Sequence, residues 1–212
     1  MQRESNIGKQ ALIVDMNVTE YFKDSLSSAL SHQKVKAEED TVFYVVNLLA
    51  WFARAENLFP ASQPGLVGQP LALTYADAVK ATSLEEREAA LRRLGDVALV
   101  VAGLFAASFS RKLVDIDYYI AMGGSAYGVL SEQASSSVRS RTFRAIFGEL
   151  SVKFQAFVDA LAEVGDNTPL GSQTDVLRLY EIWMKTGSAY AAERLRKHGI
   201  EPAKAAVSGR FN

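Results

Sequence analysis

The residues between 117 and 128 combine polar groups with glycines at a spacing that could create a binding site. Their segment, DYYIAMGGSAYGVL, holds three glycines among aromatic and aliphatic residues. Intervals of four, three and four place Asp117, Ala121, Gly124 and Gly128 on one face of a helix. We call these four residues the glycine strip. The strip has a carboxylate at one end and almost no side chains, so a neighbouring group can approach the backbone closely.

Two interpretations of the glycine strip stay open. In the first, a second helix packs against it, because small residues let two helix backbones come close together. We favour this one, since a buried glycine more often marks the close approach of protein than of a ligand. In the second, a small molecule or cofactor lies on the helix, and polar groups orient it. The residues that would contact that ligand are Asp117, Tyr118, Gly124, Ser125, Tyr127 and Gly128.

The second interpretation resembles the arrangement in heme oxygenases, which are all-helical enzymes of similar length. They lay heme against a glycine-containing helix and bind its iron through a histidine near the N-terminus, a part that the resemblance would give to His32. The residues that follow, QKVKAEED, match no ligand motif. A lone histidine at a helix end is usually a cation that complements the helix dipole. The sequence therefore identifies no cofactor.

A second candidate site is the start of a predicted helix in the segment SSSVRSRTFR. Arg139, Arg141 and Arg144 follow several hydroxyl side chains there. Backbone N–H groups at a helix start, together with guanidinium groups, can bind a phosphate. We favour the alternative that this segment is a loop with solvated arginines.

Residue types that are missing or rare exclude several classes of site. The chain has no cysteine, which excludes disulfides, thiolate metal sites and cysteine nucleophiles. Neither of its two histidines, His32 and His198, belongs to a Glu-x-x-His pair of the kind that binds di-iron centres. Motifs of zinc hydrolases, nucleotide-binding loops and serine hydrolases are also missing. We therefore predict no metal site and leave open whether the protein is an enzyme.

Charge and hydropathy argue against nucleic acids and membranes as partners. The formal net charge is −1, whereas a surface that follows phosphates normally needs a basic excess. The longest apolar run, Val97–Ala107, falls short of the roughly 20 residues of a membrane span. The N-terminus lacks the pattern of a signal peptide. We expect a soluble, cytoplasmic protein.

Helical spacing of apolar residues dominates the chain, and strand alternation is nearly absent. We predict an all-α fold, a single domain over residues 1–212, built as a bundle of seven or eight helices around a buried, glycine-bearing central helix. The ends, 1–16 and 203–212, should be peripheral or mobile. The helices are expected at about 19–32, 41–59, 73–80, 85–109, 115–130, 142–164, 176–186 and 188–198.

Local signals predict several helix ends and one buried polar residue. Ser83 and Glu86 have the spacing of a capping box. Gly187 and Gly199 are placed to end the last two helices. Asn47 lies inside the apolar run FYVVNLLAWF, so we expect it to be buried and to fix the register of its helix.

Because no catalytic constellation emerges, we expect a protein that works through protein–protein contacts, as a regulatory or scaffolding partner and as a homo-oligomer. Tyr180, Trp183 and Tyr190 are candidate anchors, since aromatic residues are common at interfaces, but they suit a core equally well. The alternative is a small-molecule or cofactor binder, or an enzyme with acid–base groups between Asp115 and Tyr127, that uses the groove over 117–128.

Overall fold

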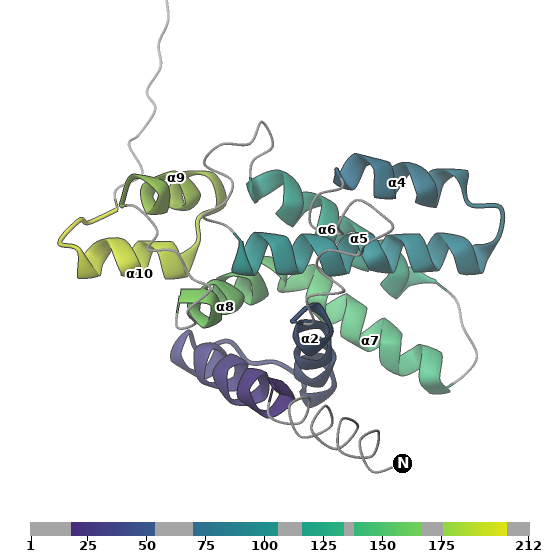
Figure 1. The fold of residues 1–212 in the computed structure, drawn as a ribbon, viewed down its shortest axis with the longest axis horizontal. Helices are drawn as coiled ribbons and strands as arrows, with labels where there is room; N and C mark the ends of the chain where they lie inside the picture. The colour runs from purple at the N-terminus through teal and green to yellow at the C-terminus, as the bar shows by residue number, and fades with distance from the viewer. Residues whose placement is uncertain (1–17, 54–69, 106–115, 134–137, 167–175, 203–212) are drawn as a thin grey trace, which may run out of the picture.

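The all-α prediction is confirmed by the computed structural model, which describes residues 18–53, 70–105, 116–133, 138–166 and 176–202 (Figure 1). These residues form 9 helices, compared with the seven or eight expected, and contain no strand. The helices are 18–32, α2 (Glu39–Phe52), α4 (Leu71–Lys80), α5 (Leu84–Leu104), α6 (Ile116–Glu132), α7 (Val138–Val152), α8 (Phe154–Asp166), α9 (Val176–Thr186) and α10 (Ala189–Lys197). None of the described helices combines the length and hydropathy that a membrane crossing requires. The expected peripheral ends, 1–16 and 203–212, lie outside the described residues.

The extra helix arises because the segment 142–164, expected as one helix, bends at Lys153. The helical hydrogen bonds continue through the bend, since the Lys153 N–H donates to the Glu149 carbonyl at 2.9 Å. The Lys153 Nζ donates to Glu149 Oε1 at 2.7 Å and to the carbonyl of Lys36 at 2.8 Å. Lys36 lies in the connection before α2, so the bend is tied to a segment far away in sequence. The apolar stripe continues through both halves, so nothing in the sequence predicts that the helix is interrupted at Lys153.

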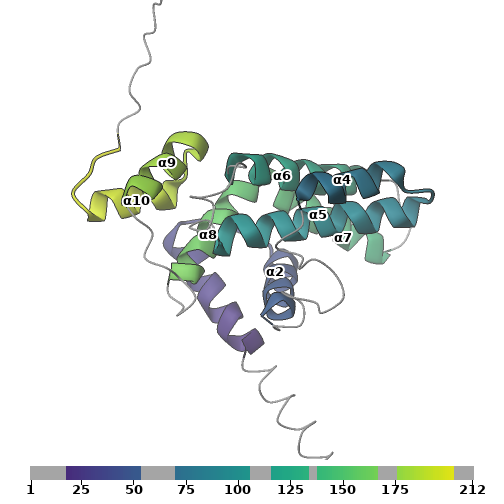
Figure 2. The same cartoon turned by 45° about the horizontal axis from the view of Figure 1, so that its top comes forward.

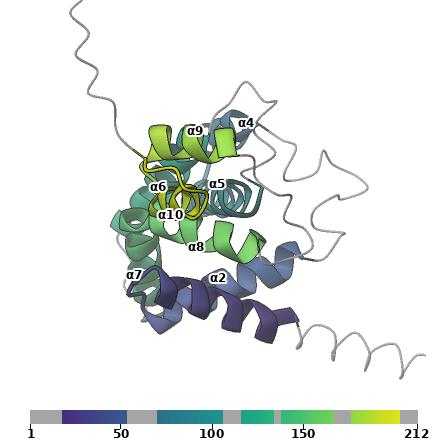
Figure 3. The same ribbon diagram turned by 90° about the vertical axis from the view of Figure 1, so that its left-hand side faces the viewer.

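The longest helix, α5, lies along the long axis of the molecule, with α4 folded back against it and α6 beside it (Figure 1). α7 packs against α6, and α8 packs against α5. α9 and α10 form a pair at one end (Figure 2). The helix over 18–32 and α2 cover the side opposite α4 (Figure 3). α5 and α6 therefore form the centre on which the other layers rest.

The ends of α5 and α10 follow from their sequences, as expected. Ser83 Oγ accepts from the Glu86 N–H at 3.1 Å, and the Glu86 carboxylate accepts from the Ser83 N–H at 3.3 Å, which completes the capping box. Gly199 ends α10 at a φ of 76°, a conformation that favours glycine. The Ile200 N–H then donates to the Leu195 carbonyl at 3.0 Å, as in a Schellman motif.

Glycines in α5 and α6 allow these two central helices to lie close together. A Cβ added to Gly123 would lie 2.8 Å from Ala98 Cβ and 2.7 Å from Phe154 Cε2. A Cβ on Gly124, in contrast, would lie 3.6 Å from Phe154 Cβ, an ordinary contact. Of these two neighbouring glycines, close packing therefore requires Gly123, which is not part of the glycine strip.

Two neighbouring glycines should respond to alanine with opposite signs. We expect Gly123→Ala to lower the free energy of unfolding by about 1–3 kcal/mol, because the new methyl group overpacks the core. Gly124→Ala should leave it unchanged or raise it by up to about 1 kcal/mol, because alanine is the better helix former. Urea denaturation followed by circular dichroism measures both. Equal effects of the two substitutions would contradict this account.

Candidate functional site

The glycine strip is exposed at one end and packed against protein at the other. Asp117 and Ala121 are exposed, whereas Gly124 and Gly128 are partly buried. A Cβ on Gly128 would lie 3.1 Å from Ser151 Oγ of α7, so this end of the strip faces the α7–α8 bend. The close approach of Ser151 therefore explains why position 128 is a glycine. It does not explain the other end of the strip, where Asp117 and Ala121 are exposed.

The other predicted ligand contacts do not gather on one surface. Ser125 is exposed, and Tyr118 is half-buried with its ring edge-on to that of Tyr119 at 6.0 Å. Tyr127 is fully buried and points into the core. Its ring stacks on that of Phe147, with centroids 5.4 Å apart. A ligand over 117–128 stays a prediction that would not engage Tyr127.

The three arginines of the predicted phosphate site all lie in α7, so the interpretation of their segment as a loop is wrong from Val138 onwards. Their surroundings differ. Arg144 Nε donates to the Ser131 carbonyl at 3.0 Å, in the last turn of α6, where a cation complements the helix dipole. Arg141 is exposed, and the side chain of Arg139 lies outside the described residues. Arg144 is thus already engaged at the end of α6, and a phosphate site here stays a prediction.

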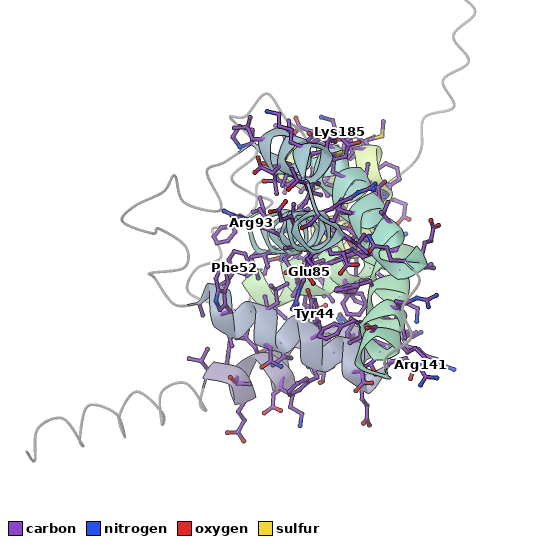
Figure 4. The ribbon with its side chains drawn as sticks, turned by 90° about the vertical axis from the view of Figure 1, so that its right-hand side faces the viewer. Tyr44, Phe52, Glu85, Arg93, Arg141 and Lys185 are labelled. Carbon is purple, nitrogen blue, oxygen red and sulfur yellow. The ribbon has the colours of Figure 1, made fainter. Side chains whose placement is uncertain are left out.

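A buried cluster that the sequence did not single out joins three helices. Asp96 of α5 accepts hydrogen bonds on Oδ1 from the hydroxyl of Tyr44 at 2.6 Å and from that of Tyr127 at 2.7 Å. Tyr44 belongs to α2 (Figure 4), and Tyr127 belongs to α6. Arg92 Nε donates to the Tyr44 hydroxyl at 3.1 Å and lies 3.8 Å from Asp96 Oδ2. We call Tyr44, Arg92, Asp96 and Tyr127 the tyrosine–aspartate cluster.

The electrostatics of the cluster keep both tyrosines protonated. Burial raises the pKa of Tyr44 and of Tyr127, and the carboxylate of Asp96 beside them raises both further. Burial also raises the pKa of the Asp96 carboxyl, while the two tyrosine hydrogen bonds and the charge of Arg92 oppose that shift. The guanidinium of Arg92 lies over the Tyr44 ring, 5.2 Å from its centroid, and remains half-exposed. Both tyrosines donate hydrogen bonds to Asp96, and Arg92 is the most exposed member of the cluster.

This arrangement is suited to holding helices together. Both hydroxyl groups are directed at one carboxylate oxygen, and the Asp96 side chain keeps 15% of its surface exposed. A buried polar network whose members are hydrogen-bonded makes a core specific, because any other register leaves polar groups without partners. A single acid at the edge of the apolar run Val97–Ala107 was the signal available in the sequence. Its two partners are 52 and 31 residues away.

The remaining predicted residues have structural contacts. Trp183 and Tyr190 are buried, each 7% exposed, whereas Tyr180 is 36% exposed. Two of the three candidate anchors therefore belong to the core. Asn47 is exposed, which contradicts the predicted burial, and its Nδ2 donates to the Phe43 carbonyl one turn earlier at 2.7 Å.

His32 lies at the end of helix 18–32, as expected, and joins it to two other helices. Its Nδ1 lies 3.0 Å from Glu163 Oε1 of α8, and its Nε2 lies 3.5 Å from Glu193 Oε1 of α10. Among the residues that the structure describes, no group of three or more His, Cys, Asp or Glu side chains could hold a metal ion. The contacts with Glu163 and Glu193 agree with the expectation that His32 is a cation at a helix end.

One surface helix, α4, exposes more large apolar side chains than it buries. Its inner face against α5 is formed by Leu71, Thr74 and Ala78. Outside this face it exposes Leu73, Tyr75 and Val79, at 52%, 49% and 67%; Leu73 lies to one side of the buried face, and Tyr75 and Val79 lie to the other. Leu84, at the start of α5, is 60% exposed. We call Leu73, Tyr75, Val79 and Leu84 the α4 surface.

Comparison with protein-family models, with curated proteins and with solved structures finds no match for the chain.

The tyrosine–aspartate cluster predicts that two substitutions of Asp96 change the free energy of unfolding by different amounts. Asp96→Ala should lower the free energy of unfolding by about 2–4 kcal/mol, because it leaves two buried hydroxyls without their acceptor. Asp96→Asn keeps an acceptor oxygen and should change stability at neutral pH by less than about 1 kcal/mol. Urea denaturation of both variants measures this. If alanine is tolerated as well as asparagine, the cluster does not hold the helices together.

The same carboxyl predicts a pH dependence. Because the pKa of Asp96 is raised in the folded state, its protonated form favours folding. That contribution is fully present below the unfolded-state pKa of about 3.9 and is lost as the pH rises through the folded-state value. Asp96→Asn cannot ionise, so its stability relative to the wild type should increase as the pH rises from about 3.5 to 7. Parallel stability profiles of the two proteins would exclude this.

Proposed function

We propose that the protein acts through protein–protein contacts, as a regulatory or scaffolding partner, and that it contacts a second copy of itself through the α4 surface. The observation that carries the proposal is the inverted polarity of α4, which buries Leu71 beside Thr74 and Ala78 but exposes Leu73, Tyr75 and Val79. A helix on the surface of a monomer normally turns its polar side to water.

Physical considerations favour a covering layer over α4. A helix of ten residues is marginal by itself and depends on packing for its stability. Here the packed face offers one leucine together with smaller side chains. Several large exposed apolar side chains gathered on one short helix commonly mark an interaction site. A second layer on the α4 surface would remove these side chains from water and stabilise α4 at the same time.

The charges beside the α4 surface favour a second copy as the occupant. Asp77 and Lys80 lie three residues apart on the exposed part of α4, so the helix contributes one acid and one base. Leu73, Asp77 and Lys80 are spaced by four and three residues and so share one side of α4. When two copies pair antiparallel along this side, each Asp77 lies near the Lys80 of the other copy. The whole chain carries a net charge of only −1, so two copies repel each other little.

A contact made by one short helix and Leu84 is small. Stable dimers usually bury about 800 Å² on each partner, which is more than the exposed side of ten helical residues can supply. We therefore expect weak association that depends on protein concentration, a property that suits a regulatory contact.

Analytical ultracentrifugation over a range of protein concentrations tests the proposal. We expect the average mass of the wild type to rise with concentration and that of Leu73→Glu to remain at the monomer value, because a charge would be buried in the contact. Val152→Glu is the matched control: Val152 is 85% exposed at the end of α7 and should not affect association. A wild-type protein that stays monomeric at all concentrations would exclude a second copy as the partner.

A charge exchange tests the antiparallel arrangement separately. Asp77→Lys and Lys80→Glu should each weaken association, because each places like charges opposite one another. The double substitution restores opposite charges and should recover association to near the wild-type level. A double variant that is weaker than either single variant would show that another surface or another orientation is used.

A further inference from the structure

The side chain of Arg178 in α9 is buried with only part of its hydrogen-bonding capacity used. The side chain is 8% exposed, and its Nη1 donates to Glu181 Oε2 at 2.9 Å. Its Nε and Nη2 atoms are inaccessible to solvent and have no hydrogen-bond partner in the described part of the chain. Since arginine stays charged in proteins, a buried guanidinium without acceptors destabilises the folded state.

The two nitrogens without acceptors form one recognition edge. Nε–H and one N–H of Nη2 point in nearly the same direction, while Nη1 lies on the other edge of the planar guanidinium. The spacing of such a pair matches two oxygen atoms of one carboxylate or one phosphate. Glu181, which is 57% exposed, lies on the other edge and supplies no acceptor to this one. The chemistry that would satisfy the Nε–Nη2 edge is therefore that of an oxyanion.

The position of Arg178 in its helix also favours an anion. It is the third residue of α9, an 11-residue helix, and so lies in the first turn. Backbone N–H groups of a first turn have no acceptor within the helix, and the helix dipole makes this end attractive to negative charge. The buried guanidinium edge and the helix end are independent features of the same turn.

We propose that Arg178 anchors a binding site for a small oxyanion, a phosphate or a carboxylate, at the N-terminal turn of α9. The Nε–Nη2 edge would bind two oxygens of the anion, and the first turn of α9 would contribute its dipole. This site is distinct from the α4 surface and from the predicted site at Arg139, Arg141 and Arg144. It does not depend on self-association.

Thermal unfolding in the presence of simple anions tests the site. The full chain is heated in chloride, inorganic phosphate or acetate at constant ionic strength, so that general screening is equal. We expect phosphate or acetate, whichever the site prefers, to raise the melting temperature saturably, by about 3 °C at tenfold excess over its Kd. Arg178→Met should abolish this rise. Arg93→Met, which removes an exposed arginine from α5 (Figure 4), should retain it.

The behaviour of Arg178→Met in chloride alone provides a second criterion. If the Nε–Nη2 edge lacks acceptors in the free protein, the Arg178→Met variant should melt at the same temperature as the wild type or above it. The substitution removes an unsatisfied buried charge. A lower melting temperature in chloride, with no response of the wild type to phosphate or acetate, would show that the chain itself satisfies the edge. That result would overturn the proposal.

The arginine Nε–H resonances give a readout that does not depend on stability. In ¹⁵N-labelled protein, the Arg178 signal is the one missing from the Arg178→Lys spectrum. The proposal expects this signal to shift saturably with phosphate or acetate while the Arg93 signal does not. Shifts that grow linearly and equally for both arginines would show only non-specific ion association and would contradict the proposal.

Discussion

The structure depends on the contact between the ring of Tyr127 and the backbone of Gly95. A Cβ on Gly95 would lie 2.6 Å from Tyr127 Cε1, so any residue other than glycine would collide with the ring. The ring also stacks on that of Phe147 of α7, at an interplanar angle of 10°. Its hydroxyl reaches Asp96, the residue after Gly95, at 2.7 Å. One side chain thus sets the separation of α5 and α6, their register and the position of α7.

Much of the fold could be predicted from the sequence because it is encoded locally. Apolar periodicity predicted the helices, and the capping box at Ser83 and the glycine end at Gly199 were confirmed. The bend at Lys153 was missed because the apolar stripe continues through it; the contact made there by Lys153 Nζ, with the Lys36 carbonyl, joins residues 117 positions apart. For Asn47, periodicity identified an apolar helix but not which side of it faces water.

The candidate sites were less predictable, because they depend on which helices meet. The sequence drew attention to glycines and polar residues around 117–128, and Tyr127 is indeed central, but as part of the core. Neither Tyr44 nor Asp96 carries a motif, since a buried hydrogen bond between α2 and α5 has no signature in either segment. The α4 surface was overlooked for a related reason: only packing shows which side of an amphipathic helix is covered. The same core that orders α5 leaves α4 on its outside, with Leu73, Tyr75 and Val79 exposed.

The most direct test of this account is a double-mutant cycle between Gly95→Ala and Tyr127→Leu, measured as free energies of unfolding in urea. If the tyrosine ring is what excludes a side chain at position 95, Gly95→Ala should lower the free energy of unfolding when residue 127 is tyrosine and change it little when residue 127 is leucine. The two effects should differ by more than about 1 kcal/mol. Additive effects of the two substitutions would contradict the central role of this contact.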